Sequence, residues 1–348
     1  ATAAHPARRR SLIAALSGPG RHFILECKRS SPSLGDFCAD FDLDRILGCY
    51  KHHAHAISVL CEEHFSRGSL EFLRYVREPC ELPVLCKDFI IAPAQLDAAA
   101  AAGADAVLLM LSVLDEELFP RLYAHARKLG LEVLCEAHTA SEVDLAVSAG
   151  VPLVGINNRD LTSLKIDLGN APRLAKGLTD TAVAVAESGL TCHRDLVAQR
   201  PVHNFLIGSA LTGAPDLEFA ANTVLYGVNK ICGLKTAAGI KAAVKAHAAL
   251  AGFIFAPRSP RCLSPEEAAA LLQPWRGRIR GVGVFVDADA AGILETVRTV
   301  QLDYVQLHGQ ESPALARELR AQCPKLGIIK AVSLEHPDGL KLAEAWLD

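Results

Sequence analysis

The stretch HFILECK, residues 22–28, decides the fold because it joins a core strand to two charged side chains at its end. The short apolar run is typical of a strand in a parallel sheet that is covered on both faces. Successive side chains alternate between the two faces of a strand, so Glu26 and Lys28 point the same way. Burying an acid and a base is unfavourable unless they are paired and have a use. The stretch therefore predicts a functional site, provided that other strands end in the same way.

Seven more apolar runs follow at regular distances, and a segment of helical length lies in each gap. These runs are AISVLCE (56–62), PVLCKD (83–88), AVLLML (106–111), EVLCEA (132–137), LVGINNR (153–159), VAVAESG (183–189) and NFLIGSAL (204–211). Near-continuous apolar strands joined by helices indicate a parallel sheet. Eight such units in about 200 residues predict a closed (βα)8 TIM barrel, which is an α/β fold. We assign it to residues 1–228.

Polar residues gather at one end of these runs. They are Glu26, Lys28, Glu62, Lys87, Glu136, Asn157, Arg159, Glu187 and Ser188. A single charged residue at a strand end is usually a solvated loop residue, but several that converge from different strands predict an active site at the C-terminal rim of the barrel.

Two short segments after the last strands have the composition of a phosphate site. ESG (187–189) and IGSAL (207–211) end the seventh and eighth runs, where barrels of this kind bind phosphate through backbone N–H groups. The hydroxyl-rich loop Ser30, Ser31, Pro32, Ser33 and Gly35 follows the first run, and Lys28 precedes it. We expect Ser31, Gly189, Gly208 and Ser209, with Lys28, to bind a phosphate group.

Composition excludes several classes of function. The chain has 348 residues, a net charge of -3 and no long run of like charges, so neither nucleic acid nor a membrane surface is an expected partner. The apolar runs are far shorter than the ~20 residues of a membrane span. Eleven cysteines without a CxxC pair predict reduced thiols in a cytoplasmic protein and no metal site.

The motifs ILECKRSSPSLG, LCKDFI, LLMLSVL, GINNRDL, ESG and FLIGSAL, in this order, resemble the indole-3-glycerol phosphate synthase family over about residues 10–228. The resemblance implies a lyase of tryptophan biosynthesis that uses no cofactor and no metal. It would close an indole ring in 1-(2-carboxyphenylamino)-1-deoxyribulose 5-phosphate, with loss of carbon dioxide and water. Matched by motif, the active-site set is Glu26, Lys28, Lys87, Glu136, Asn157, Arg159, Glu187 and Ser188.

This chemistry suggests a role for each residue. Ring closure needs a general acid at the ketone oxygen, for which we expect Lys87, and a later proton transfer, for which we expect Glu136. Lys28 would hold the substrate carboxylate or phosphate and share the acid role, and Glu26 would orient the two lysines. Asn157 and Glu187 would position substrate hydroxyls, and Arg159 would orient a neighbouring carboxylate.

Two departures from the family pattern affect the expected site. The family shows two aromatic residues before Gly-Ser after the second strand, whereas HFSRGS (64–69) has Phe65 followed by Ser66. Phe89 would then supply more of the wall around the anthranilate ring. The family also has an N-terminal helix that helps to cover the site, and we expect RRRSLIAALSG (8–18) to be an incomplete form of it and a weakened lid.

A second βα series begins after LYGVNK, with strands expected at 230–235, 252–256, 281–287, 304–309 and 328–333. It resembles phosphoribosylanthranilate isomerase, which is fused to the synthase in some bacteria, and the bifunctional arrangement is implied. Cys232 matches that family's general base, and Arg261 and His308 match its substrate-contacting positions. We expect residues 229–348 to be a truncated second barrel of about five strands, inactive as an isomerase, with an unpaired edge available for self-association.

Two other functions compete with the synthase. Another phosphosugar enzyme of the same fold, such as an isomerase or aldolase, would form a Schiff base through Lys87. A non-catalytic fragment of the same fusion would bind phosphate without turnover.

Overall fold

The computed structural model describes residues 9–31, 35–36, 38, 41–333, 335 and 339–346. The chain divides into two compact units, residues 1–217 and 218–348. Pro32 and Ser33 of the expected anion loop lie outside the described residues, as does the side chain of Ser31.

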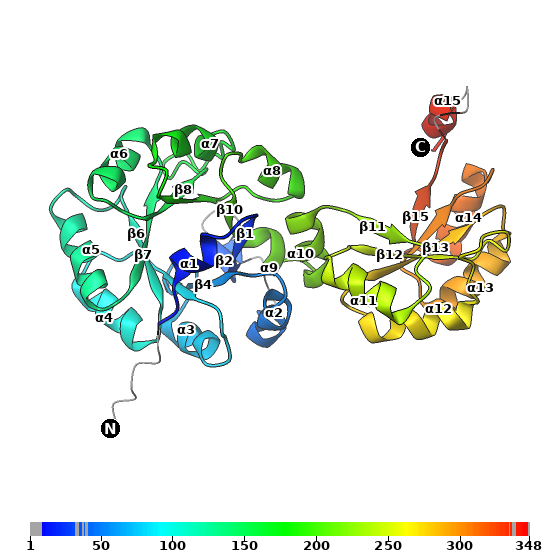
Figure 1. Ribbon diagram of the computed structural model, residues 1–348, viewed down its shortest axis with the longest axis horizontal. Coiled ribbons are helices and arrows are strands. Elements are labelled where there is room, and N and C mark those ends of the chain that lie inside the picture. Colours follow the sequence, from blue (N-terminus) through cyan, green and yellow to red (C-terminus); the bar gives the residue numbers. More distant parts are fainter. Residues whose placement is uncertain are drawn as a thin grey trace. The chain divides into compact units, whose positions relative to one another are not determined.

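The first unit is a closed barrel of eight parallel strands surrounded by helices (Figure 1). The order around the barrel is β1-β10-β9-β8-β7-β6-β5-β4. The strands are β1 (His22–Cys27), β4 (Ala56–Leu60), β5 (Val84–Lys87), β6 (Ala106–Met110), β7 (Glu132–Ala137), β8 (Leu153–Asn157), β9 (Val183–Glu187) and β10 (Asn204–Ile207). These coincide with the eight apolar runs, so the predicted TIM barrel is confirmed.

Helices and short turns connect the strands and complete the unit. They are α1 (Leu12–Leu16), α2 (Leu43–Tyr50), α3 (Leu70–Arg77), α4 (Pro93–Ala101), α5 (Leu118–Lys128), α6 (Ala140–Ser148), α7 (Asn170–Leu174), η1 (Ala175–Gly177), α8 (His193–Ala198) and α9 (Ser209–Thr212). An antiparallel pair, β2 (Ser30–Ser31) and β3 (Gly35–Asp36), follows β1.

The barrel interior is filled by one apolar cluster to which every strand contributes. Its strand residues are Ile24, Ala56, Leu85, Ala106, Leu108, Met110, Leu134, Leu153, Val185 and Leu206. Because strand side chains alternate, the residues two positions beyond Ile24, Leu85, Leu134 and Val185 also face inward. Those residues are Glu26, Lys87, Glu136 and Glu187. These charged side chains therefore face the barrel interior, directly above the apolar cluster, at the C-terminal ends of the strands.

Helix α1 closes the opposite end of the barrel. Its Leu12 and Leu16 are buried in the interior cluster, and such burial stabilises by roughly 1.5–3 kcal/mol per side chain. Glu132, the first residue of β7, accepts hydrogen bonds from the Ser11 hydroxyl at 2.6 Å and the Ile13 amide at 2.8 Å. The expectation of a lid is therefore wrong for this segment, because α1 lies at the N-terminal ends of the strands.

The second unit is an open sheet of five parallel strands in the order β11-β12-β13-β14-β15. The strands are β11 (Lys230–Cys232), β12 (Leu250–Ile254), β13 (Arg280–Phe285), β14 (Tyr304–Leu307) and β15 (Gly327–Lys330). The helical elements are α10 (Leu217–Tyr226, which starts at the unit boundary), α11 (Ala237–Lys245), α12 (Pro265–Leu272), η2 (Gln273–Trp275), α13 (Ala290–Val300), α14 (Pro313–Gln322) and α15 (Gly339–Glu344). The five βα units were predicted, but the description as a truncated barrel is corrected to an open sheet.

A hydrophobic core lies on one face of this sheet. Phe253 and Phe285 pack there with Ile240 of α11, Leu272 of α12 and Ile293 of α13. Strand alternation places Leu250 and Val282 on the other face, where they pack with Phe219 of α10. Among the described residues of either unit, no helix is both long and apolar enough to span a bilayer.

Candidate active site

A cavity of about 480 Å³ opens at the C-terminal ends of the barrel strands. Its polar lining contains all eight residues matched by motif except Glu187, which lies behind the surface, fully buried. Its apolar lining includes Phe65, Phe89, Leu108, Met110, Leu161, Leu164, Ile166 and Leu206. The cavity therefore offers charged groups at its base and an apolar wall beside them.

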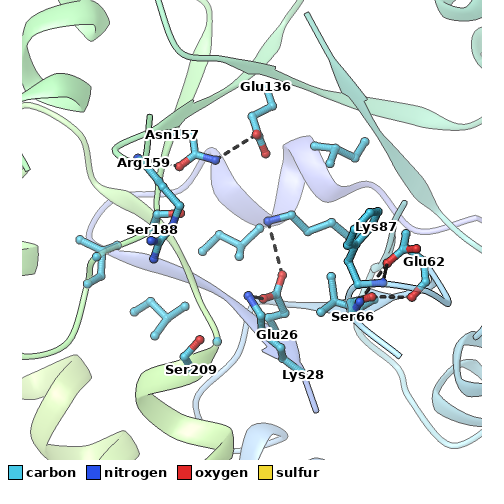
Figure 2. Close-up of a pocket in the computed structure, with 18 of the residues that line it drawn as sticks. Glu26, Lys28, Glu62, Ser66, Lys87, Glu136, Asn157, Arg159, Ser188 and Ser209 are labelled. Atoms are coloured by element: carbon cyan, nitrogen blue, oxygen red, sulfur yellow. Dashed lines mark hydrogen bonds and ion pairs between the residues drawn. The ribbon is translucent and has the colours of Figure 1, made fainter. Parts of the chain in front are cut away.

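Lys87 is the central charge of this site (Figure 2). Its Nζ lies 2.9 Å from Glu187 Oε2 and 3.4 Å from Glu26 Oε2. Burial alone would lower the pKa of Lys87, but Glu187, Glu26 and Glu136 outweigh it and raise the pKa above its ordinary value. Lys87 is therefore an ammonium group at neutral pH, able to donate a proton or a hydrogen bond into the cavity.

Glu26 connects the two lysines, as the sequence predicted. Its Oε1 lies 3.3 Å from Lys28 Nζ, and its Oε2 accepts a 3.4 Å hydrogen bond from Ser58 in addition to the Lys87 contact. Burial opposes ionisation of Glu26, but the charges of Lys87 and Lys28 prevail and lower the pKa of Glu26. The Glu26–Lys28 pair therefore gains a third charged partner, Lys87 of β5.

The pKa of Glu187 is raised, whereas that of Glu26 is lowered. Burial, together with the nearby carboxylates of Glu136 and Glu26, raises the pKa of Glu187 to about 7 although Lys87 is in contact. Three carboxylates around Lys87 repel one another, so one of them ionises last. The Oε1 atom of Glu187 is buried without a hydrogen-bond partner among the described residues.

Two glycines provide the room that these carboxylates need. A Cβ atom at Gly155, in β8, would overlap Glu187 Oε1, and one at Gly208, after β10, would lie 2.6 Å from Glu26 Oε1. Real Cβ atoms do not approach oxygen so closely, so neither position accepts a side chain without displacing a carboxylate.

Glu136 is held by two neighbours on one of its oxygens. Asn157 Nδ2 donates a 3.0 Å hydrogen bond to Glu136 Oε1, and His138 Nε2 lies 3.2 Å from the same atom. The pKa of Glu136 falls to about 2: burial opposes this shift, but His138, Lys87 and Asn157 together prevail. Sequence reasoning missed His138, although its place two residues beyond Glu136 put it on the same side of the strand.

The contact of the Arg159 side chain differs from the one expected. Asn157 donates to Glu136, and its Oδ1 accepts a 2.9 Å hydrogen bond from the backbone amide of Arg159. The Arg159 guanidinium donates to the Leu164 carbonyl at 3.0 Å instead of to a carboxylate. Arg159 nevertheless lines the cavity, and its contact fixes the loop that carries Leu164.

Four of the five residues expected to bind phosphate, Lys28, Gly189, Gly208 and Ser209, line the same cavity. Ser188, next to Gly189 in the chain, lines it too. Ser188 has φ +65°, a left-handed conformation that is unusual for a residue with a side chain and often marks a functional turn. The side-chain Nδ2 of Asn158 donates to the Ser188 carbonyl at 3.2 Å and holds this turn in place.

The aromatic wall combines the two phenylalanines singled out in the sequence. The rings of Phe65 and Phe89 meet edge to face with centroids 6.4 Å apart. Glu62 stabilises the turn before Phe65, because its carboxylate accepts the amides of His64, Phe65 and Ser66. Glu62 thus shapes the wall, whereas the sequence had placed it only among the polar residues at the rim.

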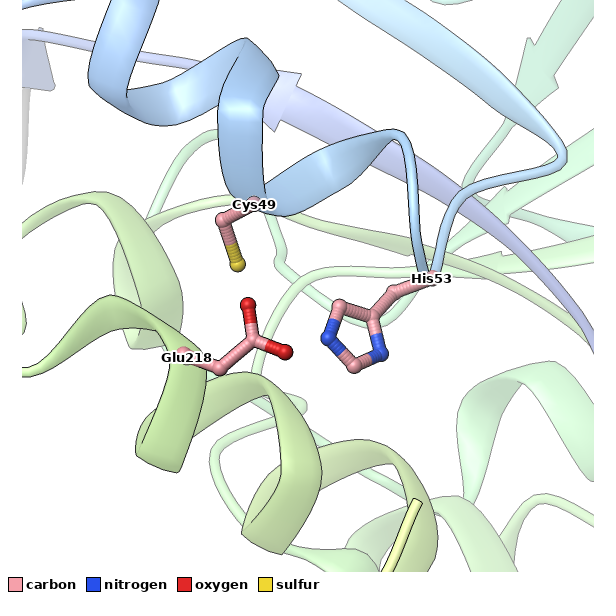
Figure 3. Close-up of side chains that lie close together, drawn as sticks. All are labelled: Cys49, His53 and Glu218. Atoms are coloured by element: carbon pink, nitrogen blue, oxygen red, sulfur yellow. The ribbon is translucent and has the colours of Figure 1, made fainter. Parts of the chain in front are cut away.

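All eleven cysteines are free thiols. Cys49 on α2 and His53 in the turn after it have ligand atoms within 4.8 Å of each other (Figure 3). A structural or catalytic zinc site takes three or four protein ligands, and the described residues of the barrel unit supply no third one here.

In the second unit, Cys232 ends β11 and its thiol is exposed. Arg261 Nη1 donates to the Cys232 carbonyl at 3.3 Å, so these two predicted residues come together. His308 follows β14, three strands away in the sheet order, and its Nδ1 lies 3.5 Å from Gln306 Nε2.

Comparison with known proteins decides the family. The family model of indole-3-glycerol phosphate synthase matches residues 1–224. This chain belongs to that family. The family model of N-(5'-phosphoribosyl)anthranilate isomerase matches residues 229–344, so the two resemblances inferred from motifs are both confirmed.

Two bacterial relatives agree with this assignment. The chain is 43% identical over 324 residues to the tryptophan biosynthesis protein TrpCF of Salmonella typhi, covering 92% of this chain and 71% of that protein. It is 42% identical over 316 residues to the TrpCF protein of Yersinia pestis, covering 90% of this chain and 66% of that protein. A solved phosphoribosylanthranilate isomerase from Thermotoga maritima is 35% identical and covers 33% of this chain and 56% of its own, with a TM-score of 0.31.

The expectation of an incomplete, inactive isomerase half is not supported. It rested on the number of strands, whereas the isomerase family model matches residues 229–344. The chain is therefore a fusion of segments from two enzyme families, and the loss of the second activity does not follow.

The fit of Glu187 against Gly155 gives a first prediction. Gly155→Ala should destabilise the barrel by about 1–3 kcal/mol, the usual effect of overpacking, because the new methyl group meets a buried carboxylate. Gly48→Ala is the matched control, since Gly48 is an exposed position in α2 with open space around it. Urea unfolding of both variants measures the difference. Equal stability of the Gly155→Ala variant and the unmodified protein would contradict the assigned packing.

Proposed function

We propose that the barrel unit catalyses the indole-3-glycerol phosphate synthase reaction on 1-(2-carboxyphenylamino)-1-deoxyribulose 5-phosphate. The observation that carries this proposal is the Lys87 ammonium, held by Glu187 and Glu26 at the base of a cavity with an aromatic wall. Family membership supports the same reaction. The lyase activity would place the protein in tryptophan biosynthesis.

In the first step, the ring carbon that bears the carboxylate attacks the ketone carbon, and a carbon–carbon bond forms. Lys87 donates a proton to the ketone oxygen as negative charge develops there. The bond to the carboxyl group then breaks, carbon dioxide leaves, and its bonding electron pair restores the aromatic ring. This step consumes one proton and leaves a hydroxyl group on the new five-membered ring.

The second step removes that hydroxyl group as water. An ammonium group, Lys28 or Lys87, supplies the proton to the leaving oxygen, and Glu136 accepts a proton from the five-membered ring so that the indole double bond forms. The low pKa of Glu136 keeps it ionised for this role over the physiological range. Lys28, 21% exposed and at the cavity surface, is suited to contact the substrate's anionic groups.

An aldolase-like function of the same fold would need Lys87 as a neutral amine that forms a Schiff base. The raised pKa of Lys87 favours the ammonium form and argues against it. Borohydride trapping of substrate on Lys87 would support that alternative. A fragment that binds phosphate without turnover is distinguished by the fluorescent indole product in a steady-state assay.

The general-acid role of Lys87 gives a second prediction. Lys87→Met should lower kcat for indole formation by at least ~10²-fold, the usual contribution of a general acid. Lys128→Met, on the exposed end of α5, is the control and should retain full activity. Near-normal kcat in Lys87→Met would transfer the acid role to Lys28, which Lys28→Met tests directly.

A third prediction concerns the phosphate group. We expect it to bind between the turns that carry Gly189, Gly208 and Ser209, with Lys28 and Ser31 completing the site. A crystal structure with sulfate or phosphate should contain the anion there. An anion bound only at another part of the rim would contradict this assignment.

For the second unit, we propose phosphoribosylanthranilate isomerase chemistry with Cys232 as general base and Arg261 and His308 as substrate contacts. The family match and the meeting of Cys232 with Arg261 support it. The proposed substrates of both units are small phosphorylated molecules. Self-association through an edge of the open sheet stays a prediction.

The isomerase proposal gives a fourth prediction. Cys232→Ser should lower consumption of phosphoribosylanthranilate by on the order of 10² to 10⁴-fold, because a thiolate base is replaced by a weakly acidic hydroxyl group. Cys323→Ser, at the end of α14 in the same unit, is the control. Equal turnover by the Cys232→Ser variant and the unmodified protein would contradict the role of Cys232.

A further inference from the structure

His138 lies between two carboxylates, directly behind the active-site cavity. Its Nε2 is 3.2 Å from Glu136 Oε1, and its Nδ1 is 3.5 Å from Glu142 Oε2. Only 9% of the side chain is exposed, and both ring nitrogens are shielded from solvent. His138 does not line the cavity, so it can act on the substrate only through Glu136.

The backbone around His138 is fixed by several hydrogen bonds. Glu142, in the first turn of α6, accepts the His138 amide at 2.6 Å with the same Oε2 atom that faces the ring. Asn170 Nδ2 donates to the carbonyls of both His138 and Asn157, at 3.2 and 2.9 Å. The segment that carries the imidazole is therefore tied to the segment that carries the other donor to Glu136.

These two neighbours contact Glu136 at the same oxygen. Asn157 and His138 both address Oε1. Figure 2 shows the other oxygen of Glu136 directed toward the middle of the cavity. Holding one carboxylate oxygen from two sides fixes the direction of the other, which is the oxygen that could accept a proton from a bound molecule.

We propose that His138, as an imidazolium ion, is a positioning residue that orients Glu136 and keeps it ionised for proton transfer. This inference rests on the proposed synthase function, in which Glu136 accepts a proton from the substrate. In this arrangement Glu142 anchors the imidazole ring of His138, and the ring in turn orients Glu136, which accepts the proton from the substrate.

Charge is what holds the ring in this position. Neither ring contact has the alignment of a regular hydrogen bond, so attraction between opposite charges is the main interaction. Burial would lower the pKa of His138, but Glu136 and Glu142 outweigh it and raise the pKa to about 9. The ring is therefore charged at neutral pH and loses its charge as the pH rises through about 9.

The other charged groups near His138 also favour a positive charge on its ring. Asp160, in the loop after β8, is a third acidic group that interacts with it electrostatically. Lys87 on β5 acts on Glu136 from the other side and keeps that carboxylate ionised. Asn157 and Asn170 are neutral. Three acidic groups thus surround the imidazole, and they favour its protonated form.

The first test compares kcat and its pH dependence in three proteins. The unmodified enzyme should lose kcat as the pH rises through about 9. His138→Asn should lower kcat by on the order of 10²-fold, with little change in KM, because Glu136 is misplaced while the cavity surface is unchanged. The remaining activity should no longer decline near that pH. His125→Asn is the control, because His125 pairs with Asp97 at 2.9 Å on the outer helices, away from the cavity.

The second test measures the imidazole directly, without enzyme activity. Long-range ¹H–¹⁵N NMR of the histidine rings, with His138→Asn for assignment, should show His138 titrating near pH 9. Glu142→Gln and Glu136→Gln should each lower that pKa, because each removes one of the two attracting charges. In the assay, Glu142→Gln should move the alkaline decline of kcat to lower pH.

The outcomes separate this inference from the proposed function. No indole formation by the unmodified protein would reject the synthase function, whatever His138 does. An active protein in which His138→Asn changes neither kcat nor the alkaline decline would reject the positioning role. Lost activity with an unchanged alkaline decline would show a merely structural residue, and titration of His138 near its ordinary pKa of about 6.5 would reject the imidazolium.

Discussion

The site depends on a single buried ammonium group surrounded by carboxylates. Lys87 contacts Glu187 and Glu26, and the charge of Glu136 also favours the ammonium form of Lys87. A buried cation is tolerated only when opposite charges accompany it, and a set of buried carboxylates likewise needs a cation. Each group therefore fixes the ionisation of the others. Removing Lys87 would take from Glu187 and Glu26 the cation that contacts both of them.

The barrel makes this arrangement possible because its strands converge. Interior alternation first builds an apolar cluster from all eight strands and then, two residues later on four strands, presents charged groups. The interior at that level is narrow, so side chains from different strands meet there. Gly155 and Gly208 have no side chains, and this leaves the space that Glu187 and Glu26 occupy. The same geometry that forms the core thus positions the chemistry.

Sequence patterns predicted most of the barrel and most of the cavity lining. The eight apolar runs and the same-face spacing of Glu26 and Lys28 are local signals, and both depend only on the period of a strand. The ion pairs of Lys87 join residues about 60 and 100 positions apart in the chain, so their partners follow only from the closed barrel. Motif resemblance selected residues that come together at the cavity but did not specify their pairing. Asn157 donates to Glu136, for which no pairing was predicted, and Arg159 donates to a carbonyl group where a carboxylate was expected.

Other features lay outside what local patterns reveal. The segment around Leu12 and Leu16 is apolar in sequence, but its position at the N-terminal ends of the strands follows only from its burial in the interior cluster and its hydrogen bonds to Glu132. In the sequence, His138 is an ordinary residue at a strand end, and only the structure places it between Glu136 and Glu142. The second unit shows the converse limit. Its βα repeat was clear, yet a repeat of strands and helices does not determine whether the sheet closes.

The protonation state of Lys87 is the most direct test of this account. In heteronuclear NMR of the lysine side chains, with Lys87→Met for assignment, surface lysines should titrate around their ordinary pKa of about 10.4. Lys87 should remain an ammonium group after the surface lysines have lost their protons, because Glu187, Glu26 and Glu136 stabilise its charge. Titration of Lys87 below the surface lysines would mean that burial outweighs the carboxylates, and it would contradict the central claim.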